Sequence, residues 1–208
     1  DLRRFDPALV SPARLAALRA AWGVPEGQPI IMLPARVTRW KGQMVLVEAM
    51  AQLPGDALAL LVGDAAERPA FQAELQARIA GLGLQDRVRL VGHATDMPAA
   101  LMLADVVVHA STDAEAFGRT VIEAQAMARP VIASDLGAPR ETVAEGITGW
   151  RTPPGDAAAL AAALSRALAM TDSERAALGA RARAAVLSGY TTAAMQAATI
   201  AVYRELLR

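Results

Sequence analysis

A run of aliphatic residues, Asp105-Val-Val-Val-His-Ala-Ser111, leads into the segment Glu115-Ala-Phe-Gly-Arg-Thr-Val-Ile-Glu123. The aliphatic run predicts a buried strand, and the residues after the Phe-Gly pair predict an amphipathic helix. Free amide groups at a helix N-terminus bind phosphate oxygens, and carboxylates accept hydrogen bonds from sugar hydroxyls. The strand, the loop and the helix N-terminus together predict a site for an anion that carries hydroxyl groups.

The same alternation of short strands and helices continues on both sides of this segment. Further strands are expected at 29–33, 57–62, 88–91, 130–134 and 148–151, and helices at 42–53, 67–80, 97–103, 118–127 and 139–144. From Asp156 the pattern predicts helices only, at 156–170, 173–187 and 191–208. Short, continuously aliphatic strands separated by helices are typical of a parallel sheet covered on both faces. We expect an α/β fold, with a doubly wound parallel sheet of about six strands and a helical C-terminal segment, 156–208, in one domain, 1–208.

Composition narrows the class of protein. Lys and Arg number 21 and Asp and Glu number 21, whereas a nucleic-acid-binding protein has a basic excess. Cysteine is absent, which excludes disulfides and thiolate chemistry. The first residues lack the apolar core of a signal peptide, and no apolar run approaches the roughly 20 residues of a membrane span. We therefore expect a cytoplasmic protein, and the missing initial Met indicates a piece of a longer chain.

Polar residues follow each predicted strand where it ends. They occur in five segments: Arg36 to Lys41, Gly63-Asp64, Gly92-His93, Ser111 to Thr120, and Ser134 to Pro139. Because the carboxyl ends of parallel strands share one edge of a sheet, these segments are expected to converge on one crevice. The guanidinium of Arg36 and the ammonium of Lys41 suit a diphosphate there.

The two histidines are not expected to be catalytic. His109 is interpreted as a core or site-wall residue of a buried strand, and His93 as a loop residue. Trp40 and Trp150 are interpreted as packing residues. The loop acids Asp113 and Asp135 belong to no cluster with metal-ligand spacing, so no metal site is predicted.

Taken together, these motifs resemble the donor half of retaining glycosyltransferases with the GT-B fold. The matching positions are Arg36, Lys41-Gly42, Gly63-Asp64, Val91-Gly92, and 115–123 with its two Glu separated by seven residues, the mark of the group 1 family (family 4). The segments 130–141 and 146–149 are similar to the next part of that family's pattern. The resemblance covers essentially the whole chain and implies a Rossmann-like, nucleotide-sugar-binding domain.

The resemblance also implies roles for single residues. Arg36 and Lys41 would neutralise the donor diphosphate, and Glu115 would contact the hydroxyls of the transferred sugar, which makes these three the catalytic candidates. Glu123 would bind the ribose. The remaining binding candidates lie in the strand-end loops. They are Gly63, Val91 and His93, of which the last two would meet the nucleobase, and Phe117, Gly118, Arg119 and Thr120, of which the last three would meet phosphate through their backbone amides.

By the same resemblance, the full enzyme would transfer a hexosyl group from a UDP, GDP or ADP sugar to a glycan or a lipid-linked saccharide. It would require no metal or other cofactor. The acceptor site would lie in a missing N-terminal domain, so residues 1–208 would bind nucleotide but transfer sugar poorly. Peripheral membrane association would concern the full-length enzyme only.

Two alternatives stay open at this stage. The chain could be half of a nucleotide-sugar epimerase, which shares the two-domain architecture, or a non-catalytic nucleotide-binding module. A dinucleotide-binding protein is disfavoured because no Gly-x-Gly-x-x-Gly motif follows the first strand.

Overall fold

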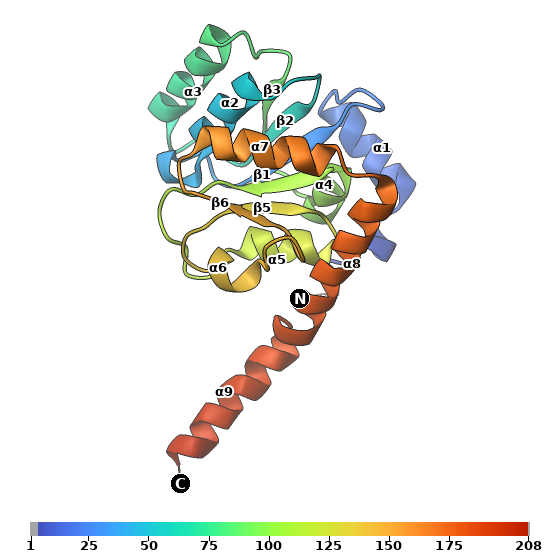
Figure 1. Ribbon diagram of the computed structural model, residues 1–208, viewed down its shortest axis with the longest axis vertical. Coiled ribbons are helices and arrows are strands. Elements are labelled where there is room, and N and C mark those ends of the chain that lie inside the picture. The colour runs from blue at the N-terminus through green and yellow to red at the C-terminus, as the bar shows by residue number, and fades with distance from the viewer. Residues whose placement is uncertain (1–3, 208) are drawn as a thin grey trace.

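The computed structural model describes residues 4–207, which are built around one six-stranded sheet (Figure 1). The strand order is β3-β2-β1-β4-β5-β6, and every neighbouring pair is parallel. The strands are β1 (Ile30–Pro34), β2 (Leu58–Val62), β3 (Val88–Gly92), β4 (Val106–His109), β5 (Val131–Ser134) and β6 (Trp150–Thr152). The predicted fold class is therefore confirmed.

Helices cover both faces of the sheet. One face carries α2 (Gln43–Gln52), α3 (Pro69–Gly81) and α7 (Ala157–Leu168), and the other carries α1 (Pro12–Ala21), α4 (Met97–Leu103) and α5 (Arg119–Ala126). Along β1, Ile31 and Leu33 enter the first core, whereas Ile30 and Met32 enter the second. The four central strands β1, β2, β4 and β5 are buried along their whole length, so they read as nearly continuous apolar runs, whereas the edge strands β3 and β6 are only partly buried.

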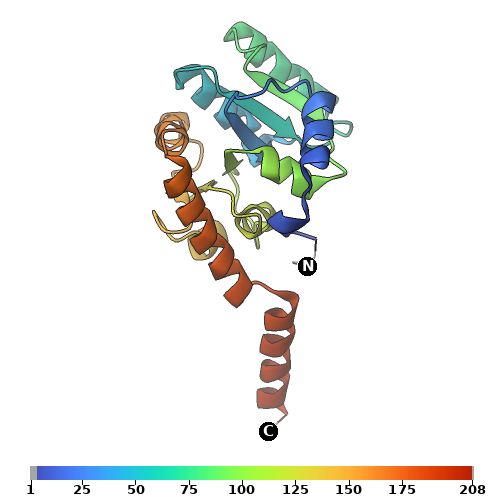
Figure 2. The ribbon, with the colours of Figure 1, turned by 90° about the vertical axis from the view of Figure 1, so that its right-hand side faces the viewer.

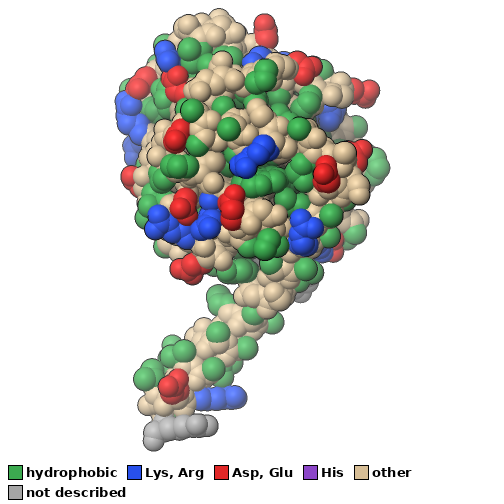
Figure 3. Space-filling model, viewed as in Figure 1, with side chains coloured by type: hydrophobic (Ala, Val, Ile, Leu, Met, Phe, Trp, Pro, Cys, Tyr) green, Lys and Arg blue, Asp and Glu red, His purple; other side chains and the backbone are tan. Residues whose placement is uncertain are grey.

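The C-terminal helices leave the sheet. Helix α8 (Asp172–Gly189) packs against α5, with Val186 beside Ile122 and Ala126. Helix α9 (Thr192–Leu206) projects away from the body of the molecule in both ribbon views (Figures 1 and 2). Apolar side chains are exposed along it (Figure 3), namely Met195, Ile200, Val202, Tyr203 and Leu206. No helix within residues 4–207 is both long and apolar enough to span a bilayer.

Helix α1 was not predicted from the sequence. Ser11 caps it by accepting a hydrogen bond from the Arg14 amide, and Pro12 occupies its first turn, a combination typical of helix starts. None of its residues is fully buried, so its apolar pattern is weak. Leu15 and Leu18 pack, partly buried, against the core, and Arg14 adds a contact to α4, since its guanidinium donates to both carboxylate oxygens of Asp96 at 2.6 and 2.8 Å.

Smaller elements complete the chain, and a few boundaries differ from those expected. The 3₁₀ helices η1 (Pro7–Leu9) and η2 (Arg39–Lys41) and the short helix α6 (Pro139–Thr142) lie in connecting segments. Strand β6 begins two residues later than expected, because 145–149 forms a turn closed by the Gly146 amide and the Gly149 carbonyl. The last helix was expected to run to residue 208, which, like residues 1–3, lies outside the described residues.

Candidate functional site

The candidate site lies where the strand order reverses. Strands β1 and β4 are neighbours in the sheet, and their connections run to opposite sides, which is where doubly wound sheets bind ligands. A cavity of about 530 Å³ opens between the segments that follow these two strands. It is lined by Pro34, Ala35, Arg36 and Lys41 from the first segment, and by Glu115, Ala116, Phe117, Gly118, Arg119, Thr120 and Glu123 from the second.

Two glycines let the site loops approach one another. Gly42 has φ of 77°, and a Cβ atom there would lie 1.9 Å from the carbonyl oxygen of Ala110, so the loop after β1 rests directly on the end of β4. Gly137 has φ of 65°, and its Cβ would lie 2.7 Å from the carbonyl oxygen of Glu115. That oxygen accepts the Ala138 amide at 3.0 Å. The loop after β5 therefore holds the backbone of Glu115.

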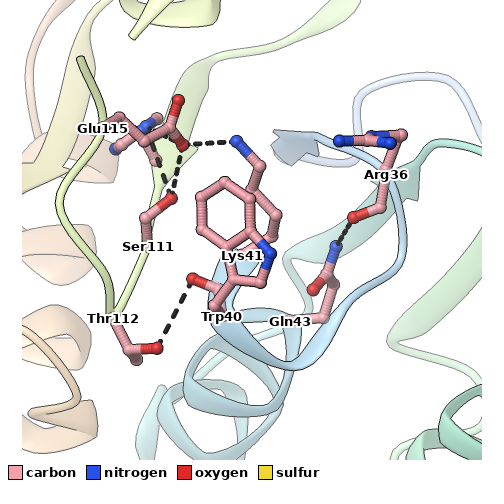
Figure 4. A network of polar contacts seen from close by, with 8 residues as sticks. Arg36, Trp40, Lys41, Gln43, Ser111, Thr112 and Glu115 are labelled. Carbon is pink, nitrogen blue, oxygen red and sulfur yellow. Dashed lines mark hydrogen bonds and ion pairs between the residues drawn. The ribbon is translucent and has the colours of Figure 1, made fainter. Parts of the chain in front are cut away.

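The Glu115 carboxylate is the centre of a hydrogen-bond network (Figure 4). Its Oε1 atom accepts from Lys41 Nζ at 2.5 Å, from Ser111 Oγ at 2.7 Å and from His109 Nε2 at 2.9 Å. Burial opposes ionisation of the carboxyl group, but the hydrogen bonds from His109, Lys41 and Ser111 outweigh it and lower the pKa of Glu115 to about 2. Glu115 is therefore an anion at neutral pH.

Lys41 is held from two sides. Besides its bond to Glu115, its Nζ atom lies 4.0 Å from the centroid of the Trp40 ring, a cation–π contact. The Trp40 carbonyl in turn accepts the Thr112 amide at 2.8 Å. The side chain predicted to neutralise a phosphate is thus placed between the two strand-end segments.

Arg36 supplies a second cation at the cavity. Its guanidinium is exposed and forms no ion pair within residues 4–207. Its backbone is fixed instead, because its carbonyl accepts Gln43 Nε2 at 2.8 Å (Figure 4). Gln43 has 0% of its surface exposed, so the loop that carries Arg36 is anchored to the core while the charge stays accessible.

The N-terminus of α5 faces the same cavity. Gly118 precedes the helix, and no side chain caps it. The Val121 amide bonds to the Gly118 carbonyl, whereas no residue within 4–207 accepts from the amides of Arg119 and Thr120. Such amides, with the helix dipole, favour an anion.

One turn into the helix, Glu123 accepts from Arg119 at 3.2 Å, with 17% of the Glu123 side chain exposed against 82% for Arg119. Phe117 is half exposed and lies edge to face with Tyr190, the residue that follows α8. A neighbouring cavity of about 400 Å³ shares Phe117, Arg119 and Glu123 with the first.

Three predicted site residues do not line the central cavity. Gly63, Val91 and His93 lie at the ends of β2 and β3, at the same edge of the sheet but beyond β1. The Gly63 amide donates to the Gly92 carbonyl at 2.8 Å. Val91 packs against the core on the α1 and α4 face, and His93 is exposed.

Sequence reasoning did not include three residues that build the site. No binding or catalytic role was predicted for His109, Ser111 or Gln43. His109 was expected in the core or the site wall, and it does contact the Glu115 carboxylate. A signal was present, because residues two apart on a strand share a face, and His109 and Ser111 are polar at the end of an aliphatic run. Within residues 4–207, no three His, Cys, Asp or Glu side chains are grouped so as to hold a metal ion.

Comparison with known families places this geometry in context. Residues 16–185 match the sequence model of the family described as "Glycosyl transferases group 1". The chain is 37% identical over 188 residues to a D-inositol 3-phosphate glycosyltransferase from Xylanimonas cellulosilytica, an alignment that covers 89% of this chain and 45% of the relative.

Solved structures show the same relationship. A glycosyltransferase from Rickettsia africae superposes with a TM-score of 0.96 at 34% identity, over 100% of this chain and 55% of the other. HepE from Anabaena, solved with UDP and glucose, superposes with a TM-score of 0.88 at 30% identity, over 98% of this chain and 55% of the other. The chain thus spans about half the length of these relatives.

Proposed function

The chain belongs to the group 1 glycosyltransferase family, and we propose that it is the donor-binding half of a retaining enzyme that uses a UDP-sugar. One observation supports this best: the cavity at the strand-order reversal brings together two cations, free helix amides and an ionised carboxylate. A nucleoside diphosphate sugar carries the complementary groups, namely a dianionic diphosphate and a row of hydroxyls.

The diphosphate fits between the first loop and α5. Arg36 and Lys41 face the diphosphate from the β1 side. The amides of Arg119 and Thr120 face it from the β4 side. The negative charge of the diphosphate is therefore stabilised from two sides. As the sugar leaves, charge builds up on the diphosphate, and fixed donors in this position stabilise it. Glu115, in the loop before α5, then accepts from hydroxyls of the sugar, and Glu123, one turn into α5, accepts from those of the ribose.

The base is expected beyond β1, near Val91 and His93. These residues lie at the same edge as the cavity, and an extended nucleotide has to reach past the diphosphate site. UDP is our choice because HepE, at 30 to 33% identity, has been solved with UDP and with UDP-glucose.

The acceptor site belongs, in this proposal, to the other half of the enzyme. The relatives are about twice the length of the matched part, and the exposed apolar side of α9 offers a surface on which another part of a longer chain would pack. We therefore expect residues 1–208 to bind the donor but to transfer its sugar poorly.

Calorimetric titration with UDP, GDP and ADP tests the donor assignment. We expect UDP to bind, and Arg36→Ala to weaken it by about 10-fold to 100-fold, because a hydrogen bond to a charged group is worth roughly 1.5–3 kcal/mol. Arg166→Ala, at an exposed arginine on α7, is the matched control and should leave the affinity unchanged. Equal losses in both variants, or no binding of any nucleotide, would contradict the proposal.

A further inference from the structure

The two oxygens of the Glu115 carboxylate are treated very differently. Oε1 receives all three hydrogen bonds, from Lys41, Ser111 and His109. Oε2 receives none from any residue within 4–207, and Figure 4 shows it without a dashed line. Since a carboxylate oxygen offers about two lone-pair directions, Oε1 is saturated and Oε2 remains open to accept.

The three donors differ in how firmly they are held. Lys41 contacts Glu115 and Trp40 here, but its ammonium sits on a long flexible stem, and a bound diphosphate would compete with Glu115 for it. Ser111 has a hydroxyl that rotates. His109 is a rigid ring on β4, with 6% of its surface exposed, so it is the donor whose position changes least.

The hydrogen on His109 is fixed by its surroundings. Nε2 lies 2.9 Å from Oε1 of an ionised carboxylate, which can only accept, so Nε2 carries the hydrogen. The other ring nitrogen, Nδ1, is buried and has no hydrogen-bond partner within the described residues. A buried N–H without an acceptor is costly, so the neutral ring with hydrogen on Nε2 is the form that fits.

From this arrangement we propose that His109 is a positioning residue for the sugar-binding carboxylate. His109 holds Oε1 through its Nε2 hydrogen and so keeps Oε2 turned to the cavity. There Oε2 accepts from a hydroxyl of the donor sugar. Because His109 stays in place, this orientation persists after Lys41 has turned to the diphosphate. The inference deepens the proposed function and rests on it. In this proposal His109, at the end of β4, affects the binding of the sugar and not that of the nucleotide.

The test compares the affinity for UDP with that for UDP-glucose, UDP-galactose and UDP-N-acetylglucosamine. In the native chain at least one conjugate should bind more tightly than UDP. His109→Leu should abolish most of this difference, about tenfold for one lost charge-assisted hydrogen bond, while the affinity for UDP changes less than about twofold. His109→Gln, which retains an N–H donor, should restore most of the difference.

Val108→Ala is the matched structural control. Val108 is the preceding residue of β4 and enters the core on the opposite face of the sheet, so its truncation weakens the same strand without reaching Glu115. It should lower the melting temperature but leave the difference between UDP and its sugar conjugates intact. An equal loss in Val108→Ala and His109→Leu would mean that strand stability, and not positioning, causes the effect.

A measurement without ligand completes the design. Nitrogen-15 chemical shifts of the imidazole should show hydrogen on Nε2 and a bare Nδ1 at pH 7. Hydrogen on Nδ1 alone would overturn the inference. Two binding results would do the same: sugar conjugates that bind the native chain no tighter than UDP, or a His109→Leu variant that keeps the native difference in affinity between UDP and its conjugates. Failure of UDP itself to bind would instead refute the proposed function, so the two failures are distinguishable.

Discussion

Glu115 carries a charge that is stabilised by its neighbours, and this has a consequence for stability. Its pKa is lowered from 4.5 to about 2 in the folded chain. A carboxyl with a depressed folded pKa stabilises the fold above its unfolded pKa, and this contribution is lost as the pH falls through the folded value. The shift corresponds to at most about 3 kcal/mol, less with solvent screening, because the group is partly exposed.

Glu115→Gln removes this contribution. At pH 7 the variant should therefore be less stable than the native chain, and the gap should narrow as the pH falls from about 5 toward 3. Urea unfolding of both proteins at pH 7, 5, 4 and 3.5 measures the gap. A gap that stays constant over this range would show that the Glu115 charge is not stabilised as described.

At this scale the sequence allowed only part of the site to be predicted. Arg36, Lys41 and Glu115 could be assigned to one sheet edge, since each follows a strand. The ion pair of Lys41 with Glu115 could not be predicted, because the two residues are 74 positions apart. They meet only because β1 and β4 are neighbours in the sheet. Gln43 is a similar case, since its role depends on how the Arg36 loop folds back over α2.

At the scale of elements, the loop after β1 is positioned by contact with the end of β4. Gly42→Ala would place a methyl group 1.9 Å from the Ala110 carbonyl oxygen at φ of 77°. Gly155→Ala is the matched control, because Gly155 has φ of 76° but nothing within 4 Å of its Cβ position. Both substitutions carry the cost of the left-handed conformation, roughly 1–2 kcal/mol, and Gly42→Ala adds the displacement of the loop.

We expect Gly42→Ala to lose more unfolding free energy than Gly155→Ala, and to weaken UDP binding because Lys41 is its neighbour. Gly155→Ala should bind UDP as the native chain does. Denaturant unfolding and calorimetry on the two variants measure both effects. Equal destabilisation, with equal UDP affinity, would show that the two site loops are not in close contact.

Element prediction succeeded where burial dominates the pattern and failed where it does not. The central strands β1, β2, β4 and β5 are buried on both faces and could be read from their aliphatic runs, such as Val106 to Val108. Helix α1 lacks fully buried residues: Leu15 and Leu18 pack only partly buried against the core, and the ion pair of Arg14 with Asp96 joins residues 82 positions apart. The N-cap Ser11 and Pro12 did mark its start, but a cap followed by a short apolar stripe, Leu15 and Leu18, is a weak signal.

At the scale of the whole molecule, the order of the strands decides where the chemistry lies. The reversal between β1 and β4 opens the cavity, and the segments after these strands supply its cations, its carboxylates and its helix amides. The N-terminal edge of the sheet holds a second cavity, of about 500 Å³, near Asp105 and Arg129. Donor binding at the reversal is therefore the central claim.

Amide chemical shifts during a titration of the chain with UDP-glucose test this claim most directly. We predict that the largest changes fall on the loop after β1, on 111–118 and on the first amides of α5, Arg119 and Thr120. Smaller changes should appear at the ends of β2 and β3. Changes centred on the opposite edge, near Asp105 and Arg129, or no changes at saturating UDP-glucose, would contradict the account.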